Sequence, residues 1–340
     1  MTEIIADFRS DTVTRPSPEM REAMLRAELG DDVYGEDPSV NQLEAWVADM
    51  TGKEAALFCT SGTQSNLVAL LAHCQRGDEY IVGQEAHTYK YEGGGAAVLG
   101  SIQPQPIEFE VDSTLDLGKV RAKLKPQDDH FARSRLLCLE NTRSGDVLPL
   151  DYQASAADFC KDNGLSLHLD GARLFNALQR QGLAPVDITR YYDSVSLCIS
   201  KGLGAPAGSL LAGSQALIGE ARKWRKMLGG GMRQAGVLAA ACQYALQHNV
   251  HRLSQDHDNA QHLALGLASI AGLACDAGAV QTNMVFVTVE EAGRAPALRS
   301  YLAERGLLVA EGQTKRLVTH LDIDPDGIEA MITACRSFFA

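Results

Sequence analysis

The 340-residue chain contains no run of about 18 apolar residues, no Cys-x-x-Cys pair and no basic-then-apolar leader at its N-terminus. The first absence predicts that no helix spans a membrane. The other two favour a cytoplasmic protein whose thiols are free. Eight cysteines are scattered along the chain, and several lie inside apolar runs, as is usual for small core residues in a reducing compartment.

Basic residues are fewer than acidic ones. The 31 lysines and arginines face 43 aspartates and glutamates, which gives a formal net charge of −12. This balance argues against general binding to nucleic acid or to an anionic membrane, and leaves room only for a local basic pocket. The 45% of apolar residues suffices for a sizeable core, and the length allows one large domain with a smaller one.

The order of apolar and polar stretches predicts the fold class. Short strands alternate with helices from residue 54 to residue 212, which predicts an α/β protein with a mainly parallel sheet covered by helices on both faces. We expect strands at 54–60, 79–83, 135–140, 165–170, 194–199 and 208–212, the last of them antiparallel or at an edge. We expect helices at 17–29, 39–51, 67–73, 152–163, 214–228 and 234–271.

From residue 272 onward the pattern changes to a compact α+β unit. Its expected strands cover 283–289, 307–310 and 315–319, and its expected helices cover 296–306 and 325–338. No internal repeat is present.

One lysine follows directly on a buried strand. The apolar run 194–199 leads into Ser200 and Lys201, and Gly204 and Pro206 then prevent regular structure. Burial disfavours the charged form of an amine and makes it nucleophilic, as an imine-forming lysine requires. The alternative is a lysine that merely extends its charge to solvent at the end of the strand.

Other polar residues fall at the same kind of position. The small residues of 61–66 between a strand and a helix form either an anion cradle or a plain capped helix start. His87 follows another strand, where its ring either stacks on a flat ligand or is simply solvated. Ligands of parallel sheets bind beyond the carboxyl ends of the strands. The predicted strand ends carry residues 61–63, 87, 141–143, 170 and 201.

Asp170 and Lys201, 31 residues apart at two strand ends, match what pyridoxal phosphate requires. The lysine forms the imine, and the carboxylate keeps the ring nitrogen protonated. The helix start at 61–65 can hold the phosphate, His87 can stack on the ring, and Arg173 or Arg316 can bind a substrate carboxylate. The rival, a nicotinamide site, lacks its G-x-G-x-x-G motif. Because the histidines at 248, 251, 257 and 262 form no i,i+4 pair, we expect no metal site.

Longer motifs resemble the L-threonine aldolases, which belong to the β-eliminating lyase family and have the aspartate-aminotransferase-like fold. The resemblance spans nearly the whole chain and rests on residues 8–14, 30–38, 61–63, 168–173, 200–206, 229–234 and 316–320. It implies a sheet of the seven-stranded type and a homotetramer built as a dimer of dimers. The domain division that we expect is an N-terminal arm at 1–14, a large cofactor-binding domain at 15–245 and a small α+β domain at 246–340.

The resemblance also implies an activity, the reversible cleavage of L-threonine, L-allo-threonine and related β-hydroxy-α-amino acids to glycine and an aldehyde. The catalytic residues that it implies are Lys201, His87 and Asp170, and further cofactor ligands are Gly62, Thr63, Arg173 and Ser200. The substrate would meet Ser10, Tyr34, Tyr91, Arg143, Arg173 and Arg316. Lys226 and Arg233 would reach the site of a neighbouring subunit.

Position 143 departs from the family pattern, because Arg143 stands where the family usually has a histidine. An arginine stays charged and cannot act as a base near neutral pH. Either His87 performs the proton transfer without it and the preference at the β-carbon changes, or Arg143 binds a β-hydroxy diacid, or its side chain turns to solvent. A pyridoxal-phosphate enzyme of another outcome, such as a β-eliminase or a transaminase, and a non-catalytic scaffold are the alternative classes.

Overall fold

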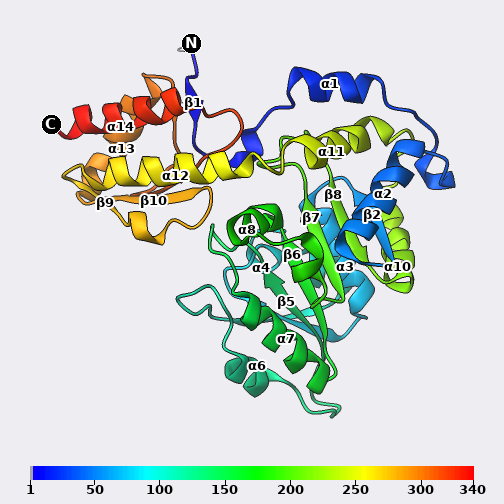
Figure 1. Cartoon of the computed structure of the whole chain (residues 1–340). Helices are drawn as coiled ribbons and strands as arrows, with labels where there is room; N and C mark the ends of the chain where they lie inside the picture. Colours follow the sequence, from blue (N-terminus) through cyan, green and yellow to red (C-terminus); the bar gives the residue numbers. More distant parts are fainter. Residues whose placement is uncertain (1–2) are drawn as a thin grey trace.

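The computed structural model describes residues 3–340 and has a seven-stranded sheet at its centre (Figure 1). The strands lie in the order β2 (Ala55–Cys59), β8 (Ser209–Gly213), β7 (Ser194–Cys198), β6 (Ser166–Gly171), β5 (Arg133–Glu140), β3 (Asp78–Gly83) and β4 (Gln103–Ile107). Neighbours from β7 to β4 are parallel, whereas β8 is antiparallel to both β2 and β7. The predicted α/β class and mainly parallel sheet are therefore confirmed.

Strand β4 escapes prediction because it contains Pro104 and Pro106. Proline has no N–H to donate to a sheet ladder and is confined to edge strands. The strand lies at the edge of the sheet and pairs only with β3, opposite Tyr80 and Val82. For this reason the sequence of residues 103–107 does not predict a strand.

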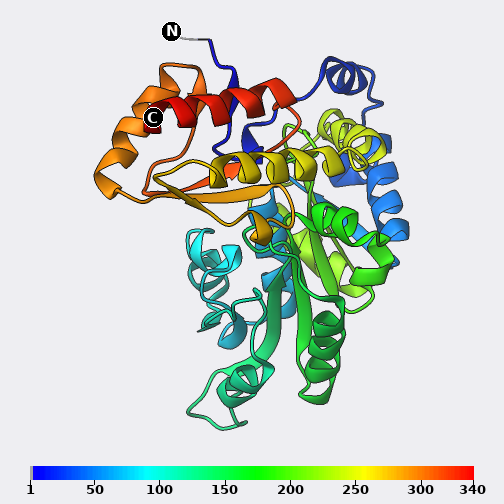
Figure 2. The same ribbon diagram turned by 60° about the vertical axis from the view of Figure 1, so that its left-hand side comes forward.

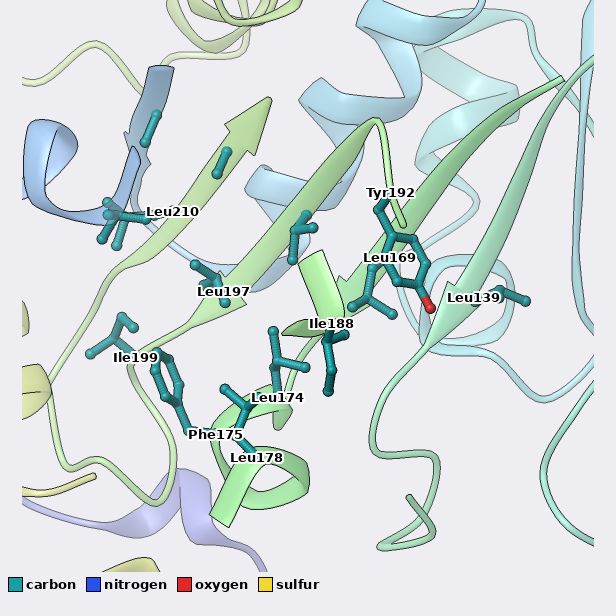
Figure 3. Packing of buried hydrophobic residues seen from close by; sticks show 14 of the residues in the cluster. Leu139, Leu169, Leu174, Phe175, Leu178, Ile188, Tyr192, Leu197, Ile199 and Leu210 are labelled. Carbon is teal, nitrogen blue, oxygen red and sulfur yellow. The ribbon is translucent and has the colours of Figure 1, made fainter. Parts of the chain in front are cut away.

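Helices cover the two faces of the sheet differently. Leu139, Leu169, Leu197 and Leu210 form an apolar layer against helix α8 (Leu174–Gln181) and Ile188 of helix α9 (Pro185–Thr189) (Figure 3). Helix α3 (Gly62–His73) lies on the opposite face. The other helices around the sheet are α2 (Pro38–Thr51), α4 (His87–Lys90), α5 (Gly95–Gly100), α6 (Leu117–Lys123), α7 (Leu150–Asp162) and α10 (Gln215–Met227).

Two helix predictions need correction. Helix α1 (Pro18–Leu25) ends four residues before the expected Leu29. The segment 234–271 forms two helices, α11 (Gly236–His248) and α12 (Leu253–Ala268), separated at Asn249. The Asn249 side chain donates a hydrogen bond to the carbonyl of Leu203 at 2.8 Å, an interaction that competes with helix continuation and ties this turn to the loop after Lys201.

The C-terminal part forms the expected α+β unit. Its three-stranded antiparallel sheet has the order β12 (Thr314–Val318), β10 (Met284–Val289) and β9 (Leu273–Cys275). Helices α13 (Ala295–Ala303) and α14 (Pro325–Phe339) complete it together with α12, whereas the short strand β9 lies outside the predicted elements.

The N-terminal segment joins this C-terminal unit (Figure 2). Strand β1 (Ala6–Asp7) pairs in parallel with β11 (Leu307–Leu308), and Phe8 is fully buried in the second apolar core. The two cores divide near the start of α12, because Leu253 belongs to the first and Ala260 to the second. The domain boundaries after residues 14 and 245 stay predictions.

Among the helices of residues 3–340, none is both long enough and apolar enough to cross a bilayer.

Replacement of Phe8 by alanine should lower the free energy of unfolding by about 3–5 kcal/mol, because a fully buried ring would leave a cavity between β1 and the second core. Urea unfolding followed by circular dichroism measures the change. The matched control is Ile4→Ala, since Ile4 is 60% exposed and should shift stability by less than about 0.5 kcal/mol. Equal effects at the two positions would contradict the packing of the arm.

Candidate active site

Four polar residues meet at one edge of the large sheet. Glu140 ends β5 and Asp170 lies near the end of β6, and the two are register partners on the same face. Lys201 follows three residues after the end of β7, and His87 begins α4 beyond the end of β3. Because β3, β5, β6 and β7 run parallel, their carboxyl ends bring the predicted residues His87, Asp170 and Lys201 to the same edge, together with Glu140.

Helix α3 contacts the sheet through polar side chains at this point. Ser196 Oγ donates to Ser65 Oγ at 2.6 Å, and Asn66 Nδ2 donates to Asp170 Oδ2 at 3.0 Å. The same face of the sheet therefore holds hydrogen-bonding groups where the opposite face holds leucines (Figure 3). Asp170 is 3% exposed, and its Oδ1 accepts from the backbone N–H of Ala172 at 3.1 Å. Such donors hold a buried carboxylate in one orientation.

His87 is held from two directions. Its backbone N–H donates to Glu140 Oε2 at 2.9 Å, and its Nδ1 lies 2.8 Å from Glu92 Oε1. The hydrogen bond to Glu92 raises the pKa of His87 above its usual value, although burial and the nearby Lys201 charge oppose the rise. Burial and the charge of Asp170 raise the pKa of Glu140 to about 7. One ring nitrogen of His87 and one carboxylate oxygen each of Glu92 and Asp170 all lie within 4.8 Å of one another. Three titratable groups therefore lie close together at this site.

Residues 61–66, predicted to be either an anion cradle or a plain capped helix start, form the beginning of α3. Ser61 is its N-cap and accepts a hydrogen bond from the Gln64 N–H at 3.2 Å, which leaves Gly62 and Thr63 in the first turn. The N–H groups of a first helical turn have no partner within the helix and attract anions. A Cβ atom on Gly230 would lie 2.2 Å from Gln64 Nε2, so the glycine loop 229–231 packs closely against this turn.

Arg173 makes a bidentate ion pair with Asp11. Its Nε and Nη2 atoms donate to the two Asp11 oxygens at 2.7 and 2.6 Å, and Asp11 is fully buried. Burial opposes the ionisation of Asp11, but the guanidinium outweighs it and lowers the pKa of Asp11 to about 2. Because this fork of Arg173 is occupied, Arg316 is the better placed of the two to bind a substrate carboxylate. Arg316 Nη2 donates to the Arg9 carbonyl at 3.4 Å, and no carboxylate within residues 3–340 forms an ion pair with it.

The remaining predicted residues occupy varied places. Ser10 caps a short 3-10 helix at Asp11–Val13, and the rings of Tyr34 and Tyr91 are exposed, the latter 5.8 Å from the His87 ring. Ser200 Oγ lies 3.6 Å from Cys198 Sγ.

Lys226 and Arg233 lie together with the loop that precedes α2. Arg233 pairs with Asp31 at 2.9 Å, and a Cβ atom on Gly231 would lie 2.7 Å from Lys226 Cδ. No hydrogen bond or ion pair in the described part of the chain links either of them to Asp170. Arg225, next to Lys226 in the last turn of α10, is 3% exposed and pairs with Asp32 at 2.7 Å, so one basic side chain of this turn is buried.

Arg143 stacks on an aromatic ring. Its guanidinium carbon lies 4.5 Å from the centroid of Phe109, and its Nη1 lies 3.4 Å from Ser113 Oγ. It lines a cleft of about 380 Å³ together with Met284 and Phe286 from the C-terminal unit. The structure thus places Arg143 between the two cores.

Sequence reasoning missed the residues that hold the predicted ones in place, namely Asp11, Asn66, Glu92 and Glu140. Glu140 carried one signal, since an acid at the end of an apolar strand must find a partner. Asn66 carried none, because its partners Glu92 and Asp170 are 26 and 104 residues away. Glu92 lies five residues after His87, but nothing in the sequence marks it as the partner of that ring.

Comparison with known proteins assigns the chain to a family. The model of the β-eliminating lyases matches residues 7–291, so the chain belongs to the β-eliminating lyase family. The low-specificity L-threonine aldolase of Escherichia coli (strain K12) is 54% identical over 98% of this chain and 99% of that protein. Low-specificity L-threonine aldolase 1 of Arabidopsis thaliana is 46% identical over 92% of this chain and 89% of the relative.

A solved structure has the same fold. The structure of Leishmania major threonine aldolase superposes with a TM-score of 0.83 at 22% identity, covering 98% of this chain and 99% of that chain. At this identity the likeness supports the fold alone.

The ion pair between Asp11 and Arg173 predicts a pH-dependent contribution to stability. The pKa of Asp11 falls from 3.8 to about 2 on folding, and a drop of this size corresponds to about 2 kcal/mol. Because the folded pKa is the lower one, this stabilisation is complete above pH 4 and is lost as the pH falls toward 2. The stability difference between the wild type and Asp11→Asn should therefore shrink when urea unfolding is measured at pH 3 instead of pH 7.

The control for this experiment is Glu22→Gln, which removes an exposed carboxylate paired with Arg26. It should change stability by less than about 1 kcal/mol at either pH. A difference for Asp11→Asn that is as large at pH 3 as at pH 7 would refute the contribution of the Asp11 charge.

Proposed function

We propose that the protein is a pyridoxal-phosphate-dependent aldehyde-lyase that cleaves L-threonine, L-allo-threonine and related β-hydroxy-α-amino acids to glycine and an aldehyde. The observation that carries the proposal is the meeting of Asp170, His87 and Lys201 at the carboxyl edge of the parallel sheet. The relative from Escherichia coli, which is named for this activity, matches the chain over nearly its whole length.

The residues present fit the proposed cofactor. Asn141 Nδ2 and Thr142 Oγ1 are buried directly after β5 without a hydrogen-bond partner among the described residues. These atoms are therefore free to bind a ligand at this edge. The first turn of α3 offers N–H groups to a phosphate. Bound pyridoxal phosphate supplies the electron sink for the electron pair that is released when the Cα–Cβ bond of the substrate breaks.

The roles of the chain's own residues follow from their chemistry. The Lys201 amine would hold the cofactor covalently, and the Asp170 carboxylate would keep its ring nitrogen protonated. Arg316 and Ser10 bind and orient the substrate carboxylate, with Arg173 beside them. His87 takes the proton of the β-hydroxyl group as the aldehyde leaves, and a proton delivered to Cα completes glycine.

The comparisons favour threonine-type substrates over a preference for β-hydroxy diacids. Both relatives described above carry "low-specificity" in their names. Tyr34 and Tyr91, which are 76% and 61% exposed, would border the substrate without enclosing its side chain. The guanidinium of Arg143 contacts Phe109, where it can shape the entrance without acting as a base.

Assembly and location are further parts of the proposal. A homotetramer built as a dimer of dimers would let Lys226 and Arg233 reach the site of a neighbouring subunit. A cytoplasmic location is consistent with the eight cysteines, all of which are free.

The test is a product analysis of the cofactor-loaded protein with L-threonine, L-allo-threonine, phenylserine and 3-hydroxyaspartate. We expect equal amounts of glycine and aldehyde, with no marked gain for the diacid. Lys201→Arg should lower the rate by more than about 1,000-fold, because an always-charged guanidinium cannot replace the amine.

The matched control is Lys223→Arg, since the Lys223 side chain is 74% exposed. It should retain full activity. Release of ammonia and a keto acid in place of glycine and aldehyde would contradict the proposed reaction.

A further inference from the structure

Glu92 is a buried acid to which none of the roles above assigns a task. It follows α4, and its side chain is only 4% exposed. Its Oε1 atom lies 2.8 Å from Nδ1 of His87 and accepts a hydrogen bond from Nδ2 of Asn66 at 2.9 Å. A carboxylate oxygen with two donors is held in one place, so Glu92 is a rigid partner for the imidazole.

The Asn66 amide can have only one orientation here. Its two N–H groups serve Glu92 Oε1 and Asp170 Oδ2, at 2.9 and 3.0 Å. The reverse orientation would place Oδ1 against two carboxylate oxygens, which accept and do not donate. Asn66 is 2% exposed. Its amide therefore bridges Glu92, the acid that contacts His87, and Asp170, the proposed partner of the cofactor's ring nitrogen.

A series of hydrogen-bonded neutral side chains on the Oδ1 side of Asn66 supports this orientation. His168 Nε2 lies 3.5 Å from Asn66 Oδ1, and His168 Nδ1 lies 2.7 Å from Ser194 Oγ. His73 Nε2 lies 2.7 Å from the same hydroxyl. Burial lowers the pKa of His168 to about 3 and that of His73 to about 4, so both rings are neutral at pH 7. Each group then donates to the next: His73 to Ser194, Ser194 to His168, and His168 to Asn66 Oδ1.

These contacts determine the tautomer of His87. When Nδ1 donates to Glu92, the neutral ring carries its lone pair on Nε2. The backbone N–H of His87 is held by Glu140 at the same time. The charged groups that face the ring are Glu92, Asp170, Glu140 and Lys201, and of these Glu92 forms the hydrogen bond to the imidazole.

We propose that Glu92, clamped by Asn66, is a positioning residue that holds His87 in the tautomer with a free Nε2 and so enables this nitrogen to take the β-hydroxyl proton. The proposal rests on the proposed function for the identity of that proton. The placement of the imidazole by Glu92 is independent of the substrate and can be measured separately.

Glu92→Gln is the central variant, because it keeps the size of the side chain and removes its charge. We expect kcat for L-threonine to fall about tenfold or more, since a well-placed base contributes 10²–10⁴-fold, with little change in KM. Because Glu92 raises the pKa of His87, the acid limb of the kcat/KM profile should move to lower pH in the variant.

Two further variants separate positioning from folding. Glu92→Asp keeps the charge and should restore the acid limb toward its wild-type position. Glu85→Gln is the matched control, since it removes an exposed carboxylate near the same helix, where Glu85 pairs with Lys90. It should leave kcat and the pH profile unchanged.

A second measurement does not depend on turnover. Diethyl pyrocarbonate modifies neutral imidazole, and peptide mass mapping of the cofactor-loaded protein gives the modification rate of His87 as a function of pH. The midpoint of this curve should be lower in Glu92→Gln than in the wild type. Equal midpoints, or a Glu92→Gln variant with lowered thermal stability but unchanged kcat per loaded site, would overturn the proposal.

The two proposals fail in different ways. A wild-type protein that forms no glycine and aldehyde from any of the four substrates contradicts the proposed function. The comparison of His87 modification in the wild type and Glu92→Gln still decides the role of Glu92 in that case.

Discussion

Buried negative charge is the constraint on which the site depends. Four acids lie in the interior around the carboxyl edge of the large sheet, namely Asp11, Glu92, Glu140 and Asp170. A buried carboxylate is costly unless it is paired or hydrogen-bonded. Arg173 satisfies Asp11, and the single amide of Asn66 serves both Glu92 and Asp170. Burial still raises the pKa of Glu92, and burial together with the charge of Asp170 raises the pKa of Glu140 to about 7.

This arrangement links the fold to the chemistry. The parallel register of β5 and β6 puts Glu140 beside Asp170, and α3 carries both the anion-binding first turn and Asn66. One helix would thus hold the phosphate of the proposed cofactor and, through Asn66, orient Asp170, the proposed partner of its ring nitrogen. The ion pair between Asp11 and Arg173 connects the N-terminal arm to the same edge. Because Phe8 of this arm packs in the second core, the arm contacts both that core and the site.

Much of this was open to prediction from the sequence, because it depends on local pattern. The alternation of strands and helices indicated the parallel sheet, and the positions of Asp170 and Lys201 after strands indicated the site. The missed elements depend on distant partners. Strand β4 contains two prolines, so only its pairing with β3 at the edge of the sheet identifies it as a strand. Glu92 becomes a functional candidate through its contact with His87, five residues before it, and through the hydrogen bond that Asn66, 26 residues away, donates to it.

The central claim is that Lys201 is the amine that holds the cofactor opposite Asp170. The most direct measurement is reduction of the cofactor-loaded protein with sodium borohydride, followed by peptide mapping. The account predicts one pyridoxyl group per chain, attached to the peptide that contains Lys201. A label on any other lysine, or no label on a protein with full cofactor occupancy, would contradict it.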